Sequence, residues 1–319
     1  MAKIVILDGY SVNPGDLSWD GIAAQGDLNV YDRTPADQVI ARIGDADAIF
    51  TNKCVITGEI LDACPNLKFV GELATGYNNI DVKAAAQRGV CVSNIPAYST
   101  DSVVQMTFAL LLEACHHVGE HSKAVHAGDW SSSPDFCFWN FPLVELTGKT
   151  LGIIGFGRIG QGVAKVARAF GMNVLAYGPR YKPEMDQNGC KAATLDELFA
   201  NADVISLNCP LFDETKNLIR KENIDKMKDG VIIVNTARGA MLNEADVRAA
   251  LDSGKIGYLC ADVACVEPMP ADSPLLGAEN AILTPHIAWA PKEARTRLMT
   301  IAEGNLRAWL AGNPVNRVG

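Results

Sequence analysis

The chain has 319 residues, 48% of them hydrophobic, which is enough for two domains with separate cores. Its formal net charge of −9 argues against general nucleic-acid binding, which needs clustered lysine and arginine. No apolar run reaches the ~18 residues of a membrane span, and because a predicted strand begins at Lys3, we expect no signal peptide. Because the nine cysteines are expected to be reduced thiols, we expect a cytoplasmic protein.

Residues 1–100 alternate between short apolar strands and helices, as in an α/β unit with a parallel sheet. The strands are expected at 3–7, 28–31, 46–50 and 67–71, and the helices at 36–43 and 81–88. A long helix is then expected at 101–117, where it would bridge to a second domain.

Segment 127–146 breaks this alternation. It holds Gly128, three serines and Pro134, and then a run of aromatic residues from Phe136 to Phe141. Aromatic residues are enriched at subunit interfaces, but such a loop can equally fold onto its own domain. The sequence leaves both interpretations open.

Residues 151–160, LGIIGFGRIG, form an apolar strand that runs into a G-x-G-x-x-G turn and a helix expected at 158–170. Gly155 would make the tight turn, Gly157 would let the backbone approach phosphates, and Gly160 would let helix and strand pack closely. The helix N-terminus would present its N–H groups to a pyrophosphate. A strand–turn–helix without a ligand is the alternative, and the residues downstream disfavour it.

The alternation of strands and helices continues after this turn. Thr194 and Glu197 form a predicted capping box, and the last helix is expected at 291–310. Together with 149–154, the strands expected at 174–177, 204–208, 231–235, 257–263 and 281–284 make a six-stranded sheet covered on both faces. The last helix has no place in that sheet, so we expect it to return to the first domain.

Three polar side chains follow strands of the second predicted sheet, at the edge where parallel sheets bind ligands. Arg238 follows strand 231–235, Glu267 lies beyond Asp262, and His286 follows the last strand. An arginine can bind and polarise a 2-oxo acid, a histidine can donate a proton near neutral pH, and a glutamate can orient the histidine. Each residue alone would more often be structural or solvated, but the three together favour catalysis.

These residues lie in motifs that resemble the D-isomer-specific 2-hydroxyacid dehydrogenases, most closely the glycerate dehydrogenase and hydroxypyruvate reductase branch. The resemblance spans essentially the whole chain and is carried by ATGYNNID at 74–81, GFGRIG at 155–160, NTARG at 235–239, Asp262 with Glu267-Pro268, and TPHIAW at 284–289.

The resemblance implies an α/β protein of two Rossmann-like or flavodoxin-like parallel-sheet domains with a cleft between them. Residues 1–100 plus 288–319 would form a discontinuous substrate-binding domain, and residues 101–287 the dinucleotide-binding domain. It also implies a homodimer formed through the aromatic arm at 127–146.

The implied reaction is reduction of a small 2-oxo acid to the D-2-hydroxy acid with NAD(P)H. Arg238 would bind the substrate carboxylate and carbonyl, Glu267 would orient His286, and His286 would donate the proton. Asn52, Thr75, Gly76 and Tyr77 would contact the substrate. The implied cofactor-binding residues are Val103, Gly155, Gly157, Arg158, Ile159, Gly160, Gly178, Arg180, Asn208, Cys209, Pro210, Thr236, Ala237, Asp262 (at the nicotinamide amide) and Ala288.

One departure from the family pattern bears on the cofactor. NAD enzymes usually carry an acidic residue about 20 residues after the glycine turn, where it binds the ribose hydroxyls. Here that position is Gly178, and Arg180 is close by. Without the carboxylate, a 2′-phosphate is not repelled, and an arginine can bind it. We therefore expect NADP to be accepted and preferred; the alternative is ordinary NAD binding with Arg180 in solvent.

No metal site is expected. Four histidines at 116, 117, 121 and 126 are interpreted as a solvated helix end. Hydroxypyruvate and glyoxylate are the favoured substrates, with pyruvate and bulkier 2-oxo acids behind them. The alternatives are a dinucleotide-sensing binding protein or corepressor on the same scaffold, and a formate dehydrogenase, which Glu267 disfavours because formate enzymes tend to pair the histidine with glutamine.

Overall fold

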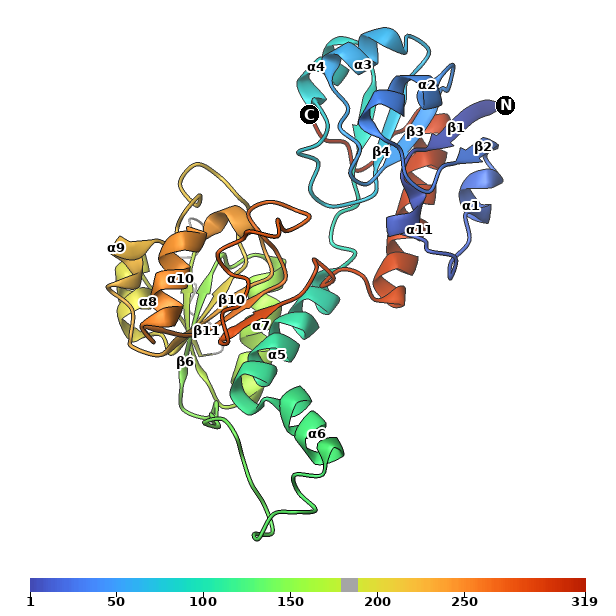
Figure 1. Cartoon of the computed structure of the whole chain (residues 1–319). Helices are drawn as coiled ribbons and strands as arrows, with labels where there is room; N and C mark the ends of the chain where they lie inside the picture. Colours follow the sequence, from blue (N-terminus) through green and yellow to red (C-terminus); the bar gives the residue numbers. More distant parts are fainter. Residues whose placement is uncertain (179–188) are drawn as a thin grey trace. The chain divides into compact units, whose positions relative to one another are not determined.

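The computed structural model describes residues 1–178 and 189–319 and divides into two compact units (Figure 1). The N-terminal unit comprises residues 1–99 and 290–319, and the central unit comprises residues 100–289. Each unit holds one parallel sheet, so the predicted fold class, α/β with two parallel-sheet domains, is confirmed. Among the described residues, no helix is long and apolar enough to cross a membrane.

The sheet of the N-terminal unit has the order β2-β1-β3-β4-β5, and all of its pairings are parallel. A five-stranded parallel sheet needs helices on both faces, because apolar side chains leave it in both directions. Its strands are β1 (Ala2–Ile6), β2 (Gly26–Val30), β3 (Ala48–Thr51), β4 (Phe69–Glu72) and β5 (Cys91–Ser93). Its helices are α1 (Asp20–Ala23), α2 (Val39–Ile43), α3 (Gly58–Ala63), α4 (Val82–Gln87) and α11 (Lys292–Leu310), with short 3-10 turns at Gly9–Ser11 and Ala36–Gln38.

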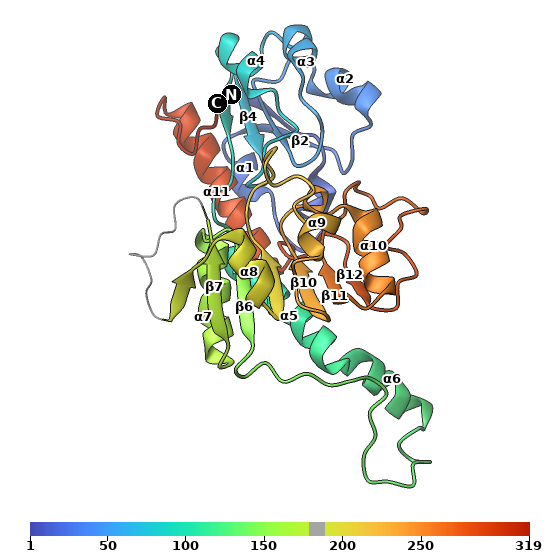
Figure 2. The same cartoon turned by 90° about the vertical axis from the view of Figure 1, so that its left-hand side faces the viewer.

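The C-terminal helix α11 is part of the N-terminal unit, where it lies beside α1 and the sheet (Figures 1 and 2). The Trp309 ring packs against Phe69 of β4, with the ring centroids 5.2 Å apart. Arg295 donates two hydrogen bonds of 2.7 Å to the carboxylate of Asp16. The prediction that the last helix returns to the first domain is therefore confirmed.

The sheet of the central unit has seven strands in the described residues, in the order β12-β11-β10-β9-β6-β7-β8. Its strands are β6 (Thr150–Ile154), β7 (Asn173–Tyr177), β8 (Cys190–Ala192), β9 (Val204–Leu207), β10 (Val231–Asn235), β11 (Ile256–Ala261) and β12 (Ala281–Leu283). Its helices are α5 (Thr100–His116), α6 (Val118–Ala127), α7 (Arg158–Ala169), α8 (Leu195–Asn201), α9 (Lys221–Ile224) and α10 (Glu244–Asp252), with a 3-10 turn at Gly239–Met241.

Successive residues of β10 point to opposite faces of this sheet. Ile233 packs in the cluster under α8, α9 and α10, whereas Val234 packs in the cluster under α5 and α7. This is why the central strands read as continuous apolar runs in the sequence.

The structure differs from the sequence expectations in several elements, and helices α1, α3, α9 and α10 were not predicted. The predicted six-stranded sheet is wrong by one strand, because β8 is a three-residue edge strand with almost no sequence signal. A second edge strand, β5, was also unpredicted. The long helix α5 ends at His116, because His117 adopts a left-handed conformation with φ 49°, and α6 begins directly after it. The capping box of Thr194 and Glu197 is confirmed.

Candidate active site

The glycine turn joins β6 to α7 in the geometry that the motif predicts. Gly155 has φ 98°, which disfavours other residues, and a Cβ there would lie 2.5 Å from the backbone nitrogen of Cys209. A Cβ on Gly160 would lie 2.1 Å from the carbonyl oxygen of Gly155. These two glycines are therefore required by the protein's own packing.

Gly157 differs from both. It is the N-cap of α7 with φ −82°, no side chain caps the helix, and a Cβ there would meet no atom of the described protein within 4 Å. The missing side chain therefore leaves room beside the N-terminus of a 12-residue helix with no acidic residue in its first turn, where Arg158 and Ile159 follow. An anion is stabilised at such a position. The turn thus fits the pyrophosphate of a dinucleotide.

Two further cofactor-site predictions lie at the ends of β7 and β9. Gly178 directly follows β7 and has no side chain. Asn208, Cys209 and Pro210 directly follow β9, where the Asn208 amide nitrogen donates to the Ser206 hydroxyl over 2.9 Å. Its Oδ1 is buried without a hydrogen-bond partner among the described residues.

Burial raises the pKa of the Cys209 thiol to about 11, so this side chain is neutral. Arg180, the other residue in the NADP prediction, lies outside the residues that the structure describes.

Arg238 follows β10 on a turn that Asn235 holds. The fully buried Asn235 side chain donates to the Arg238 carbonyl over 2.9 Å and accepts from the N–H of Ala237 over 3.1 Å. The Arg238 side chain itself is exposed, and among the described residues it donates only to the adjacent Ala237 carbonyl, over 2.7 Å. It forms no ion pair with any part of the chain that the structure describes, so its charge is available to an anion.

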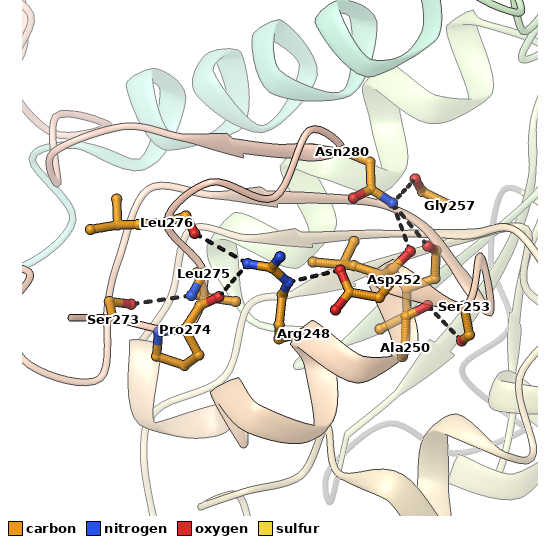
Figure 3. A network of polar contacts seen from close by, with 12 residues as sticks. Arg248, Ala250, Asp252, Ser253, Gly257, Ser273, Pro274, Leu275, Leu276 and Asn280 are labelled. Atoms are coloured by element: carbon orange, nitrogen blue, oxygen red, sulfur yellow. Dashed lines mark hydrogen bonds and ion pairs between the residues drawn. The ribbon is translucent and has the colours of Figure 1, made fainter. Parts of the chain in front are cut away.

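Arg248 of α10 shows how a structural arginine differs (Figure 3). Its guanidinium donates to the carboxylate of Asp252 and to the carbonyls of Pro274 and Leu276, at distances of 2.8 to 3.1 Å. Arg248 thus makes three hydrogen bonds to the fold, one of them to a carboxylate, whereas the one side-chain hydrogen bond of Arg238 within the described residues goes to its neighbour in the chain.

His286 and Glu267 form a hydrogen-bonded pair. The Nδ1 atom of His286 lies 2.7 Å from Oε2 of Glu267, and both side chains are about one-third exposed, at 31% and 37%. The second carboxylate oxygen of Glu267 accepts from the N–H of Ala264 over 3.1 Å. This arrangement fixes the imidazole through Nδ1 and leaves Nε2 to meet a reactant.

Asp262 holds the segment that carries His286. Its buried carboxylate accepts from the hydroxyl of Thr284 over 2.6 Å and from the N–H groups of Ile287 and Ala288 over 2.9 and 2.7 Å. His286 itself has φ 55°, so this segment is sharply bent. Sequence reasoning assigned Asp262 to the cofactor alone and missed its role in shaping this segment.

The turn of Arg238 packs directly on the loop that leads to Glu267. A Cβ on Gly239 would lie 1.9 Å from the carbonyl carbon of Ala264 and 2.4 Å from the nitrogen of Cys265. Only glycine allows this approach. Arg238 and the Glu267–His286 pair therefore belong to one edge of one sheet.

The remaining predicted contacts of the central unit lie in more buried surroundings. Val103 is 7% exposed within α5, and Ala288 is 4% exposed. The Thr236 hydroxyl lies 3.2 Å from that of Thr107 in α5, and Ala237 packs at the margin of the core.

The predicted substrate residues of the N-terminal unit are arranged around one loop. The buried Asn52 amide donates to the Leu73 carbonyl over 2.9 Å, and the Thr75 hydroxyl donates to the Ile95 carbonyl over 2.7 Å. The backbone N–H groups of Thr75, Gly76 and Tyr77 donate to no atom of the described chain. Three successive free N–H groups are available to an anion.

The comparisons with known proteins agree with this geometry. Residues 108–288 match the model of the D-isomer specific 2-hydroxyacid dehydrogenase, NAD binding domain. The chain belongs to the D-isomer specific 2-hydroxyacid dehydrogenase family. It is thus an oxidoreductase that acts on 2-oxo acids and binds NAD(P), and the resemblance found in the sequence is confirmed.

Family members match along the whole chain. A hydroxypyruvate reductase of Blautia hydrogenotrophica is 55% identical, with 99% of each chain covered. A glycerate dehydrogenase of Methylorubrum extorquens is 36% identical, over 99% of this chain and 98% of that one. The crystal structure of a D-lactate dehydrogenase from Aquifex aeolicus, complexed with NAD and lactic acid, superposes with a TM-score of 0.82 at 29% identity, over 99% of this chain and 100% of that one.

The aromatic segment packs against two of the histidines at α6, and one of these, His117, also contacts Tyr258 of β11. Figures 1 and 2 both show α6 and the segment after it projecting away from the central sheet. The prediction of a solvated helix end is wrong for His117, which is 5% exposed with its ring 4.3 Å from that of Phe141. His121 accepts from the N–H of Asn140 over 3.1 Å. These two histidines attach the segment to α6 through ring contacts and a hydrogen bond.

Proposed function

We propose that this family member reduces hydroxypyruvate or glyoxylate to the D-2-hydroxy acid with NAD(P)H. The observation that carries the proposal is the hydrogen-bonded Glu267–His286 pair on the same sheet edge as the unpaired Arg238. The 55% identical relative named hydroxypyruvate reductase supports the choice of substrate.

The central unit is the dinucleotide-binding domain in this proposal, with the bounds 101–287 predicted from the sequence. Gly155, Gly157 and Gly160 bind the pyrophosphate together with the N-terminus of α7, and the strand ends at Gly178 and Asn208–Pro210 lie along the nucleotide. When bound, the nicotinamide supplies the hydride that reaches the carbonyl carbon.

The side chains of the central unit handle the substrate oxygen atoms and the proton. Arg238 binds the carboxylate and the carbonyl oxygen, and so withdraws electrons from the carbonyl carbon. His286, charged and held through Nδ1 by Glu267, gives its Nε2 proton to the carbonyl oxygen as the hydride arrives. The neutral imidazole then takes a proton from solvent, and on oxidation the same steps run in reverse.

The N-terminal unit is the substrate-binding domain, predicted as residues 1–100 plus 288–319. Its free N–H groups at Thr75, Gly76 and Tyr77 support a role in binding the substrate carboxylate. Asn52 supports this loop indirectly, because its amide donates a hydrogen bond to the carbonyl of Leu73, just before the loop begins.

NADP is the proposed preferred cofactor. Gly178 ends β7 without the acidic side chain that would repel a 2′-phosphate, and Arg180 supplies a positive charge in this proposal. The kcat/KM values for NADPH and NADH test this, because a large preference for NADH contradicts it.

A homodimer formed through the segment at 127–146 completes the proposal. Phe136 and Trp139 are 88% and 65% exposed on a projecting segment, which supports burial against a second copy. Sedimentation of the wild-type chain and of a Phe136→Ser/Trp139→Ser variant tests it: the wild type is expected to be a dimer and the variant a monomer.

The function itself is tested by the loss of nicotinamide absorbance across a panel of 2-oxo acids, run with NADH and with NADPH. Turnover that is fastest with hydroxypyruvate or glyoxylate supports the proposal. Faster turnover of pyruvate or a bulkier acid would identify that acid, and not hydroxypyruvate or glyoxylate, as the preferred substrate. No turnover despite tight dinucleotide binding favours the sensing role instead.

A further inference from the structure

Glu72, the last residue of β4, is a buried carboxyl group that the reaction does not use. Its side chain has no exposed area, and its Oε2 accepts a 2.9 Å hydrogen bond from the amide nitrogen of Asn79. Its Oε1 has no hydrogen-bond partner among the residues that the structure describes. A buried charge with a single neutral partner is costly, so this environment favours the protonated carboxyl.

Asn79 connects Glu72 to the loop at 74–79, which carries the free N–H groups. The Asn79 amide also donates to the Cys54 carbonyl over 3.2 Å, and the Asn79 carbonyl accepts from the N–H of Ile56 over 2.8 Å. Glu72 therefore helps to fix the end of the loop that follows Tyr77, together with Cys54 and Ile56.

The start of the loop is fixed independently. The Asn94 amide donates to the Thr75 carbonyl over 2.7 Å, and the Thr75 hydroxyl donates to Ile95. Loss of the Glu72 contact would consequently loosen one end of the loop, where the contacts of Asn79 with Cys54 and Ile56 would remain, and leave the other end in place.

The charged groups around Glu72 come from two neighbouring strand ends. Asp8, after β1, accepts hydrogen bonds from the N–H groups of Asn52, Lys53 and Cys54, and its charge opposes a second negative charge nearby. The pKa of Glu72 is raised to about 9, mainly by burial; the hydrogen bond from Asn79 and the charge of Lys53 oppose this rise, and the charge of Asp8 adds to it. Burial also raises the pKa of the Cys54 thiol to about 11, so Cys54 adds no charge near neutral pH.

We propose that Glu72 is a positioning residue that holds the substrate-carboxylate loop through Asn79 as a neutral acid, and that ionising Glu72 weakens substrate binding. This inference rests on the proposed function, which places the substrate carboxylate at the N–H groups of Thr75 to Tyr77. An ionised Glu72 would add a negative charge beneath the loop and draw water into its buried contact.

The test measures KM for hydroxypyruvate and for the dinucleotide, and kcat, from pH 6 to 10 in the wild type, Glu72→Gln and Glu72→Ala. At pH values above 9, the hydroxypyruvate KM of the wild type should increase relative to that of Glu72→Gln, by a factor approaching tenfold per pH unit. The glutamine variant lacks this increase because it has no proton to lose. At pH 7, Glu72→Ala should raise the hydroxypyruvate KM by at least roughly tenfold and leave the dinucleotide KM constant. Glu72→Gln should have a hydroxypyruvate KM close to that of the wild type.

Unfolding gives a second readout that does not depend on activity. In the unfolded chain the carboxyl titrates near 4.5, and in the fold near 9, so between these values the native state binds a proton that the unfolded state lacks. The stabilisation from this proton is complete below pH 4.5 and is lost as the pH rises to 9. Relative to Glu72→Gln, the unfolding equilibrium constant of the wild type should rise by about tenfold per pH unit in that window.

The outcomes separate the two proposals. Parallel pH profiles of KM in the wild type and Glu72→Gln, or a parallel pH dependence of unfolding, overturn the inference and leave the reductase standing. No turnover of any 2-oxo acid by the wild type overturns the proposed function and this inference with it.

Discussion

The carboxyl edges of the two sheets use their polar residues in opposite ways. In the central sheet, strand ends lead to Arg238 and to the Glu267–His286 pair, which stay partly exposed and make few contacts with the fold. In the N-terminal sheet, Asn52 and Glu72 are buried at strand ends and used to hold backbone.

The difference shows two ways of building a site at the same kind of edge. The central sheet offers charged side chains that can move protons and bind anions. The N-terminal sheet offers a loop of backbone N–H groups, held in shape before any ligand arrives, which lowers the entropy cost of binding. Catalysis should therefore be sensitive to side chains on one sheet and to loop geometry on the other.

The largest expected effect comes from removing the proposed proton donor. His286→Asn keeps a residue that tolerates the left-handed conformation at φ 55°, but asparagine cannot transfer a proton. Hydroxypyruvate kcat should fall by about 10²- to 10⁴-fold, while dinucleotide affinity, measured by fluorescence titration, should change little. Retention of near wild-type kcat would show that His286 is not the proton donor.

Glu267→Gln should have a smaller effect. The glutamine can still accept from Ala264, but an amide oxygen facing Nδ1 is a weaker hydrogen-bond acceptor than a carboxylate and holds the imidazole less firmly. The reduction rate should fall by roughly 10- to 100-fold, as for other residues that orient a reactive ligand. A rate equal to the wild type across the pH range would show that the hydrogen bond does not assist His286.

These two side chains could be predicted from the sequence because strand ends in a parallel sheet are predictable from apolar runs. Continuous runs such as 231–235 identify the strands of the sheet centre, and the polar residues that follow them are then identified as site residues. The glycine turn was predictable for the same reason, since its strand and helix have clear periodicity.

Other features depend on tertiary contacts that the sequence does not reveal. β5 and β8 are three-residue edge strands, too short for a pattern. The contact of Gly239 with Ala264 joins loops 25 residues apart. Glu72 reads as an ordinary residue at the end of an apolar run, because its burial depends on the loop that covers it. Applying the strand-end rule to the first sheet as well would have identified both Asp8 and Glu72.

The smallest expected effect concerns the glycine turn. Gly157→Ala meets no atom of the described residues within 4 Å and has a permitted φ of −82°, so the fold should persist. The added methyl group should occupy space needed by the pyrophosphate and raise the dinucleotide KM by roughly tenfold, about 1.4 kcal/mol. Gly304→Ala in α11, which also meets no atom within 4 Å, is the matched control and should leave that KM unchanged.

The most direct test of the contrast between reactive and structural side chains compares two arginines of the central unit. Arg238→Ala and Arg248→Ala remove the same charge from different settings: Arg238 has no ion pair within the described residues, whereas Arg248 pairs with Asp252 and bonds to two carbonyls. The measurement is kcat/KM for hydroxypyruvate reduction. Arg238→Ala should lose about 10²- to 10³-fold, some 3–4 kcal/mol, whereas Arg248→Ala should stay within a few-fold and lose stability instead. Equal losses in both variants, or none in Arg238→Ala, would contradict the account.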